Sequence, residues 1–496
     1  MTDSVSRMAQ LCRQRNETVL ASDSFGEMDL DSFAMLQAQK VKKNRKTGAL
    51  RSGEDAEKSA VSIARQLLGE AAASRLEDAL KKKVICSADH LGSLYCSQFF
   101  QGDLLFALIL EKLGERNPAV PILAAGQVEL ENSTYARGIC AYSSRDEKRF
   151  LPFFPAKCSV QLASHASVVS SEMTERFRRR FVGELSEKQD SVEAGEDLPL
   201  RKTLDEICRE LYETEDLQKA RSFSDQTARI GKRLMDHLFP GEAPSFVYLE
   251  METVVQPLLL AELSDESSLL HLLLYDSGMR DKLIRQKLPD GLSLGDLLFR
   301  AADEKGRKIM LSLTQDGLLT GRDWRKEPVC YGPKPDELAS LIREKRVFPG
   351  VFTEVLLLFF ERGITWMGGM FQASYLPMWQ DALAAVLEEA GCEAQAEIIR
   401  AYDCTGYVCG PMYALYRGDG FATTAGPVEL WRNPVSFERI RELVRQTSLW
   451  DAHLIGLSEM YFDLTRRDER ESDWYRKIAE ELFRAYPENV VADESK

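Results

Sequence analysis

The sequence predicts a helix-rich fold of the α/β or α+β class, in which helices cover a modest mixed sheet. Two observations predict it. Short apolar runs bounded by turn-forming residues, typical of strands, gather in residues 84–155 and 246–313. Elsewhere, and above all in the C-terminal part, apolar residues recur at steps of three and four, as along one face of a helix. Hydrophobic residues make up 44% and charged residues 29% of the chain, an ordinary globular composition.

The first half of the chain begins with helical spacing and then turns to strands. Apolar residues from Ile63 to Leu80 predict a helix, and the short run Val84-Ile85-Cys86 predicts a strand. A polar loop at residues 89–93 follows, and the long apolar segment after it predicts a buried helix. Three extended pieces come next, at residues 120–130, 137–142 and 149–155.

The second half adds a few strands to a mainly helical pattern. Residues 246–255 alternate between apolar and polar, which indicates a half-buried strand. Residues 297–302 and 308–313 flank a polar turn and predict a hairpin. A helix is expected at residues 377–390, because Pro377 stands at its start and Gly391 just past its end.

With 496 residues the chain exceeds the size at which a single core stops growing, so more than one region is expected. Residues 183–200 are strongly polar and rich in turn formers. We therefore predict an N-terminal α/β region at residues 1–182, a polar linker or mobile loop at 183–200, and a helix-rich region at 201–496 that packs against the first.

Net charge and cysteine content limit which partners and which cell compartment can be expected. A formal net charge of -14 without a basic stripe argues against binding to nucleic acid, whose phosphates would repel the chain. No stretch approaches the length of a membrane span, and the first residues lack the apolar core of a secretory signal. The ten cysteines contain no C-x-x-C pair, so free thiols are expected. We predict a soluble, cytoplasmic, acidic protein, with no indication of its oligomeric state.

The polar loop at residues 89–93 concentrates side chains that carry chemistry. It lies between a predicted strand and a buried helix, where ligands bind in open α/β sheets. It holds His90, one of five histidines, which can exchange a proton near neutral pH. Ser93 could cap the following helix and present N–H groups to an anion. We predict His90 and Asp89 as catalytic residues and Ser93 as a substrate ligand; a structural histidine beside a turn former is the alternative.

A turn between two predicted strands supplies further candidate ligands. Asn132 and Arg137 lie within residues 126–138, and a guanidinium can bind a carboxylate or a phosphate with two hydrogen bonds. We predict that both residues bind substrate. A plain hairpin turn is the alternative.

Residues 363–376 contribute the last two candidates. Gly368-Gly369 permits a close approach of the backbone. Gln372 and Tyr375 are polar tips among apolar side chains, as in many ligand pockets, and we predict that both bind substrate. Tight helix packing at the glycines is the alternative. We expect this segment and Arg137 to face the loop at residues 89–93 across one cleft.

The sequence indicates no metal site and no particular cofactor. It contains no G-x-x-x-x-G-K-[ST] or H-E-x-x-H motif, and no G-x-G-x-x-G after a strand. One alternative is a divalent ion held by Asp89, His90 and a distant carboxylate such as Glu250 or Glu252. Another is a nucleophilic thiol, Cys86 or Cys96, beside His90; cysteines in buried strands are usually inert.

The fragment His90-Leu91-Gly92-Ser93 resembles the H-x-G-H loop of nucleotidylyl-transfer enzymes and class I aminoacyl-tRNA synthetases. The resemblance covers four residues, and Ser93 stands where those families have a second histidine. It implies nucleotide-dependent group transfer as one alternative. The leading hypothesis is an enzyme, with a biosynthetic role as one option, that acts on a small polar, anionic metabolite with His90 as acid or base in a cleft between the two halves. A non-catalytic helical binding or scaffold protein is the other alternative.

Overall fold

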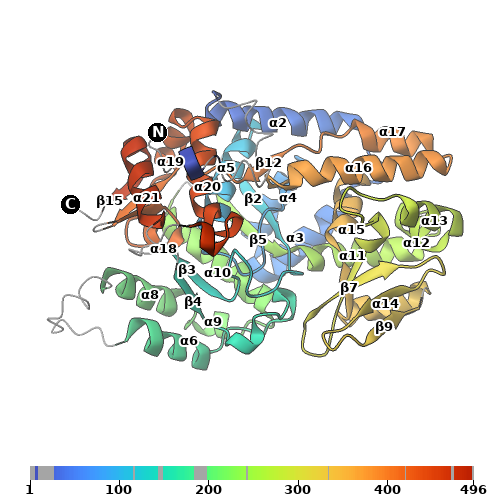
Figure 1. Cartoon of the computed structure of the whole chain (residues 1–496), viewed down its shortest axis with the longest axis horizontal. Coiled ribbons are helices and arrows are strands. Elements are labelled where there is room, and N and C mark those ends of the chain that lie inside the picture. Colours follow the sequence, from blue (N-terminus) through green and yellow to red (C-terminus); the bar gives the residue numbers. More distant parts are fainter. Residues whose placement is uncertain are drawn as a thin grey trace.

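The computed structural model describes residues 6–8, 10, 27–115, 118–142, 149–183, 198–241, 244–332, 334–418, 421–470 and 474–493. A five-stranded parallel sheet lies at its centre between layers of helices, and helix predominates over strand (Figure 1). The predicted helix-rich α/β class is confirmed.

The central sheet follows the strand order of doubly wound folds. Its strands are, in spatial order, β12 (Tyr407–Cys409), β11 (Thr365–Gly369), β1 (Val84–Cys86), β2 (Ala119–Ala124) and β5 (Ser245–Glu250). All four pairings are parallel. Counted from the β5 edge, the strands come third, second, first, fourth and fifth along the chain. The winding direction therefore reverses between β1 and β11, which makes this pair the topological switch point.

Two cores form on the two faces of the sheet because side chains alternate along each strand. Val84 and Cys86 of β1 belong to one core and Ile85 to the other. In β2, Ile122 and Leu123 divide in the same way. Both faces are covered, so every residue of the five strands except Gly369 is buried, as is typical of parallel sheets.

Helices from distant parts of the sequence cover each face (Figure 1). The first core takes apolar residues from α2 (Leu30–Thr47), α5 (Ser97–Lys112), α10 (Phe223–Leu238), α19 (Phe437–Gln446) and α20 (Leu449–Leu464). The second takes them from α3 (Glu54–Leu68), α4 (Glu70–Leu80), α11 (Met251–Ser264), α12 (Leu269–Tyr275), α13 (Ser277–Arg285), α15 (Val351–Val355), the π-helical turn η6 (Leu356–Phe360), α16 (Gln372–Glu389) and α17 (Glu393–Ala401).

The other described strands form three further sheets. The first is a five-stranded antiparallel sheet with, in spatial order, β10 (Val347–Pro349), β6 (Phe299–Ala302), β7 (Lys308–Leu313), β8 (Leu319–Arg322) and β9 (Pro328–Tyr331). A second group contains β14 (Phe421–Thr424), β13 (Leu415–Gly418) and β15 (Val490–Asp493), and a third pairs β3 (Gly138–Ala141) with β4 (Arg149–Pro152). The predicted hairpin at 297–313 is confirmed as β6 and β7. The strands expected at 84–155 and 246–313 thus divide among separate sheets instead of forming one.

The remaining helices add further apolar residues to the two cores. They are α6 (Ser171–Phe177) with the π-helical turn η4 (Arg178–Val182), α8 (Leu198–Leu211), α9 (Glu215–Gln218), α14 (Pro335–Arg343), α18 (Pro427–Leu430) and α21 (Trp474–Ala485). None of the helices in the described ranges has the length and apolar character needed to cross a bilayer.

The central sheet combines β1 and β2 with β5, β11 and β12, and so draws on both of the regions predicted at 1–182 and 201–496. Of the predicted linker, residues 184–197 lie outside the described residues. The division into two regions stays a prediction.

Candidate functional site

The carboxyl ends of β1 and β11 meet at the switch point, where open α/β sheets bind ligands. Ser87 follows β1 and Gln372 follows β11. The Ser87 hydroxyl donates to Gln372 Oε1 (3.2 Å), and Gln372 Nε2 donates to the Ser87 carbonyl (3.2 Å). Trp366 Nε1 donates to the same Gln372 oxygen (2.7 Å). Gln372 thus contacts Ser87, two residues before the loop at residues 89–93, and a cleft shared by that loop, residues 363–376 and Arg137 stays a prediction.

Gly368 makes room for this amide. A Cβ atom at Gly368 would lie 1.5 Å from Gln372 Oε1, whereas a Cβ at Gly369 would meet nothing within 4 Å. The first glycine thus permits the side chain of Gln372 to lie against the strand, and the second has no such role.

The loop after β1 is held against β2. The backbone N–H of Leu91 donates to the Ala125 carbonyl (2.9 Å), and the N–H of Ala125 donates to the Asp89 carbonyl (2.9 Å). Tyr248 of β5 donates its hydroxyl proton to the carbonyl of His90 (2.6 Å). These bonds extend the parallel pairing past the strand end, so His90 has a fixed position at the carboxyl edge.

A chain of hydrogen bonds determines which ring nitrogen of His90 carries the proton. Asn132 Oδ1 accepts the backbone N–H of Thr134 (2.9 Å) and also its hydroxyl proton (2.5 Å). The Thr134 oxygen is therefore left to accept from His90 Nδ1 (3.0 Å) and from Ser93 Oγ (2.8 Å). This network assigns the Nδ1–H tautomer. The lone pair of Nε2 is free, and no described residue bonds to it.

Three of the predicted site residues, His90, Ser93 and Asn132, thus belong to one network joined by Thr134. Sequence reasoning missed Thr134, although it stands in the same turn as Asn132. Ser93 does not cap the next helix as expected: α5 begins at Ser97 after Cys96, and the Ser93 N–H bonds back to the His90 carbonyl (3.1 Å). The loop before α5 therefore extends about one helical turn further along the chain than a cap at Ser93 would allow.

The imidazole of His90 is neutral near pH 7. Burial of the ring lowers the pKa of His90 to about 4, and the positive charge of Lys308 acts in the same direction. His90 is therefore a hydrogen-bond acceptor or a weak base at neutral pH, and it has no proton to give as an imidazolium.

Asp89 forms a buried acid pair with Asp103 of α5. The two residues are only 2% and 6% exposed. Burial raises the pKa of Asp89 to about 7, and burial with the charge of Asp89 raises the pKa of Asp103 well above its usual range. Asp103 consequently holds the proton of the pair. Its signal in the sequence is an acidic residue in the middle of an apolar helix.

Cys86 completes a group of potential metal ligands. Its Sγ lies 3.5 Å from Asp103 Oδ1 and 4.0 Å from Asp89 Oδ1, and among the described residues these three side chains offer donor atoms all within 4.8 Å of one another. A thiolate with two carboxylates suits Zn²⁺. Burial, however, raises the pKa of the Cys86 thiol far above its usual range, and a shared proton already satisfies the acid pair. The adjoining cavity of about 20 Å³ is the size of one water molecule.

A second buried acid pair lies beside the ends of β2 and β5. The backbone N–H groups of Gly126 and Gln127 donate to the Glu252 carboxylate at 2.8–2.9 Å. Gln127 Nε2 donates to Glu354 Oε2 (3.2 Å), and Glu354 Oε1 is buried without a hydrogen-bond partner. Burial and the charge of Glu250 raise the pKa of Glu252 to about 8. Burial and the charge of Glu252 raise the pKa of Glu354 well above its usual range. Because Glu252 receives the backbone donors, Glu354 is the protonated partner.

Arg137 and Tyr375 lie apart from the His90 network. Arg137 is buried in the turn before β3, where Nε donates to the Phe154 carbonyl (2.9 Å) and Nη1 pairs with Glu131 (2.5 Å). Tyr375 packs on Trp379, with ring centroids 4.5 Å apart, and the charge of Glu354 adds to burial in raising its pKa. A role for either residue in substrate binding stays a prediction.

No protein-family model and no curated protein sequence matches this chain. The functional proposal therefore depends on geometry.

Proposed function

We propose that the protein is a soluble, cytoplasmic enzyme that binds a small polar metabolite at the carboxyl edge of the central sheet, with His90 Nε2 as the acceptor for a substrate proton. The observation that carries the proposal is the network through Thr134 and Asn132, which directs the imidazole proton to Nδ1 and leaves Nε2 free. Metal-binding and catalytic imidazoles are oriented by the same kind of second hydrogen bond.

The surroundings of the edge favour a neutral or cationic substrate over the anionic one expected from the sequence. The acid pairs of Asp89 with Asp103 and of Glu252 with Glu354 lie on this edge. The guanidinium of Arg137, expected to hold an anion, is paired with Glu131. A substrate hydroxyl or ammonium group can donate to a neutral imidazole, whereas a carboxylate cannot.

Nucleotide-dependent group transfer has less support. Phosphate binding at such a loop uses free backbone N–H groups. Here the N–H groups of Leu91, Ser93 and Cys96 donate to carbonyls of the protein. The nine cysteines in the described part of the chain are free thiols, in keeping with the proposed reducing compartment.

A thermal-shift screen against a metabolite library tests the proposal, because a ligand that binds only the folded state raises Tm. We expect hits that carry a donor group, and an affinity weaker by roughly tenfold or more in His90→Ala, as for loss of one hydrogen bond to a buried partner. His271→Gln is the matched control, since His271 lies on α12 and bonds to the Leu263 carbonyl (2.9 Å). Turnover of a hit separates an enzyme from the alternative of a binding or scaffold protein. Equal affinity in His90→Ala and wild type would contradict the proposal.

A further inference from the structure

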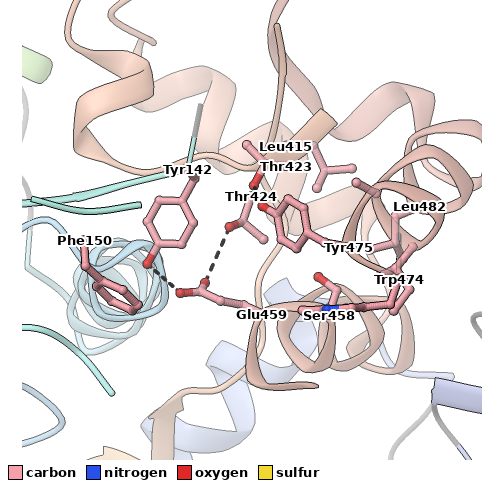
Figure 2. A pocket seen from close by; sticks show the side chains of 12 residues that line it. Tyr142, Phe150, Leu415, Thr423, Thr424, Ser458, Glu459, Trp474, Tyr475 and Leu482 are labelled. Atoms are coloured by element: carbon pink, nitrogen blue, oxygen red, sulfur yellow. Dashed lines mark hydrogen bonds between the residues drawn. The ribbon is translucent and has the colours of Figure 1, made fainter. Parts of the chain in front are cut away.

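A cavity of about 140 Å³ lies between β13, β14, α20 and α21, at a site different from the His90 network (Figure 2). Its walls are mainly apolar and aromatic, with Phe150, Leu415, Trp474, Ile478 and Leu482 among them. An apolar cavity of about 150 Å³ holds a guest of the size of benzene. The dimensions therefore match a single ring or a short branched chain.

One carboxylate gives this apolar cavity a polar end. Figure 2 shows Glu459 of α20 between Tyr142 and Thr424. The Tyr142 hydroxyl donates to Glu459 Oε1 (2.5 Å), and Ser97 Oγ donates to Oε2 (2.5 Å). Burial raises the pKa of Tyr142 far above its usual range, so this phenol keeps its proton and remains a donor.

The amino end of α5 supports the negative charge of Glu459. Ser97 is the first residue of this helix, and its backbone N–H donates to the Tyr142 oxygen (3.1 Å). The positive end of the helix dipole thus acts on the carboxylate both through Tyr142 and through the Ser97 side chain.

We infer that this cavity binds a small organic cation, with an ammonium group directed at Glu459 and an apolar body enclosed by the aromatic and aliphatic walls. An ammonium group complements a carboxylate supported in this way, and the aromatic side chains of Trp474 and Tyr475 line the cavity that encloses the apolar body. A carboxylate ligand of the same shape is repelled by Glu459. The inference does not depend on the function proposed for the His90 edge.

Titration of the full chain with benzylamine, benzyl alcohol and benzoate tests the inference. These probes share a ring and differ in charge. We expect benzylamine to bind with a Kd near 1 mM, about the affinity open to a ligand of this size. Benzoate should bind at least roughly tenfold more weakly. The indole N–H signal of Trp474, assigned with Trp474→Phe, should move with benzylamine.

Glu459→Gln should weaken benzylamine binding by roughly tenfold or more and leave benzyl alcohol binding within about threefold. Retained binding of benzyl alcohol shows that the variant keeps the cavity. Glu480→Gln is the matched control, because Glu480 is exposed on α21 and should leave benzylamine binding unchanged. The inference is overturned if benzoate binds as well as benzylamine, if Glu459→Gln binds benzylamine as wild type does, or if the Trp474 signal does not respond.

Discussion

Single carboxyl groups inside the protein link its stability to pH. Glu354 is completely buried, and burial together with the charge of Glu252 raises its pKa well above the usual range. The pKa of Glu252 is raised to about 8. In the unfolded chain both groups titrate near 4.5. The folded protein therefore binds more protons than the unfolded protein between about pH 4.5 and 8, and its free energy of unfolding falls as the pH rises through this range.

Each such carboxyl group lowers the free energy of unfolding by up to about 1.4 kcal/mol per pH unit. Glu354→Gln resembles the protonated form and removes one of these groups. We expect its free energy of unfolding, measured with urea from pH 5 to 8, to fall less steeply than that of wild type. Glu337→Gln, at an exposed position, should follow the wild-type slope. Parallel curves for Glu354→Gln and wild type would show that Glu354 is ionised in the folded protein.

At the scale of single elements, the end of β11 and the start of α16 organise the switch point. The amide of Gln372 bridges the two strands through Ser87 and Trp366, and it fits only because residue 368 lacks a side chain. Neither Gly368 nor Gly369 has a positive φ, so backbone strain does not complicate a substitution at either position.

Gly368→Ala should displace the Gln372 amide and cost about 1–3 kcal/mol of unfolding free energy, through the lost hydrogen bonds of buried groups. The fluorescence of the six tryptophans should change with it, because Trp366 loses its acceptor. Gly369→Ala, one residue away in open space, should cost less than about 1 kcal/mol. Equal costs for the two variants would exclude the fit of Gln372 as the reason for Gly368.

At the scale of the whole molecule, Arg362 connects two helices of the second core, α3 and α11, to the central sheet. It is 1% exposed, precedes β11, and donates to Asp55 of α3 (2.8 Å) and to Glu262 of α11 (2.7 Å). Glu361 is a further partner at 3.2 Å. Glu262 and Glu361 are each 1% exposed, and Arg362 is the buried cation beside them, while the partly exposed Arg51 is a second partner with its Nε 3.3 Å from Glu262 Oε2.

Arg362→Met should cost about 3–5 kcal/mol of unfolding free energy, because buried carboxylates lose their cation. Arg400→Met is the surface control: Arg400 pairs with Glu388 at 2.9 Å with 40% of its side chain exposed, and its loss should cost less than about 1 kcal/mol. Denaturant unfolding measures both. A small effect at Arg362 would mean that water reaches these carboxylates.

The sequence predicted the elements whose pattern is local. Val84-Ile85-Cys86 and the β6–β7 hairpin are where they were expected. Strands β11 and β12 were missed, because Thr365–Gly369 ends in two glycines and Tyr407–Cys409 lies between Gly406 and Gly410, where the sequence resembles a loop. Helix α16 begins at Gln372, five residues before Pro377, since the contacts of Gln372 and Tyr375 stabilise a first turn that the proline alone did not indicate.

The candidate site was predicted only where the local sequence marked a residue. His90, Ser93, Asn132 and Gln372 have polar contacts at the carboxyl edge, and their sequence contexts marked them. Asp103, Thr134 and Glu354 did not stand out, because their importance comes from neighbours that only the fold brings together. Arg137 looked available from its sequence, but Glu131, six residues before it, occupies the guanidinium.

We propose that His90 is a neutral Nδ1–H imidazole whose Nε2 is free at the carboxyl edge. Nitrogen-15 NMR of the side chains measures it directly, and with only five histidines in the chain a His90→Gln variant assigns the signal. We predict a protonated Nδ1 and an unprotonated Nε2 from pH 5.5 to 8, and a tautomer mixture in Thr134→Val but not in Thr134→Ser. An imidazolium at pH 6.5, or a proton on Nε2 in the wild-type protein, would contradict the claim.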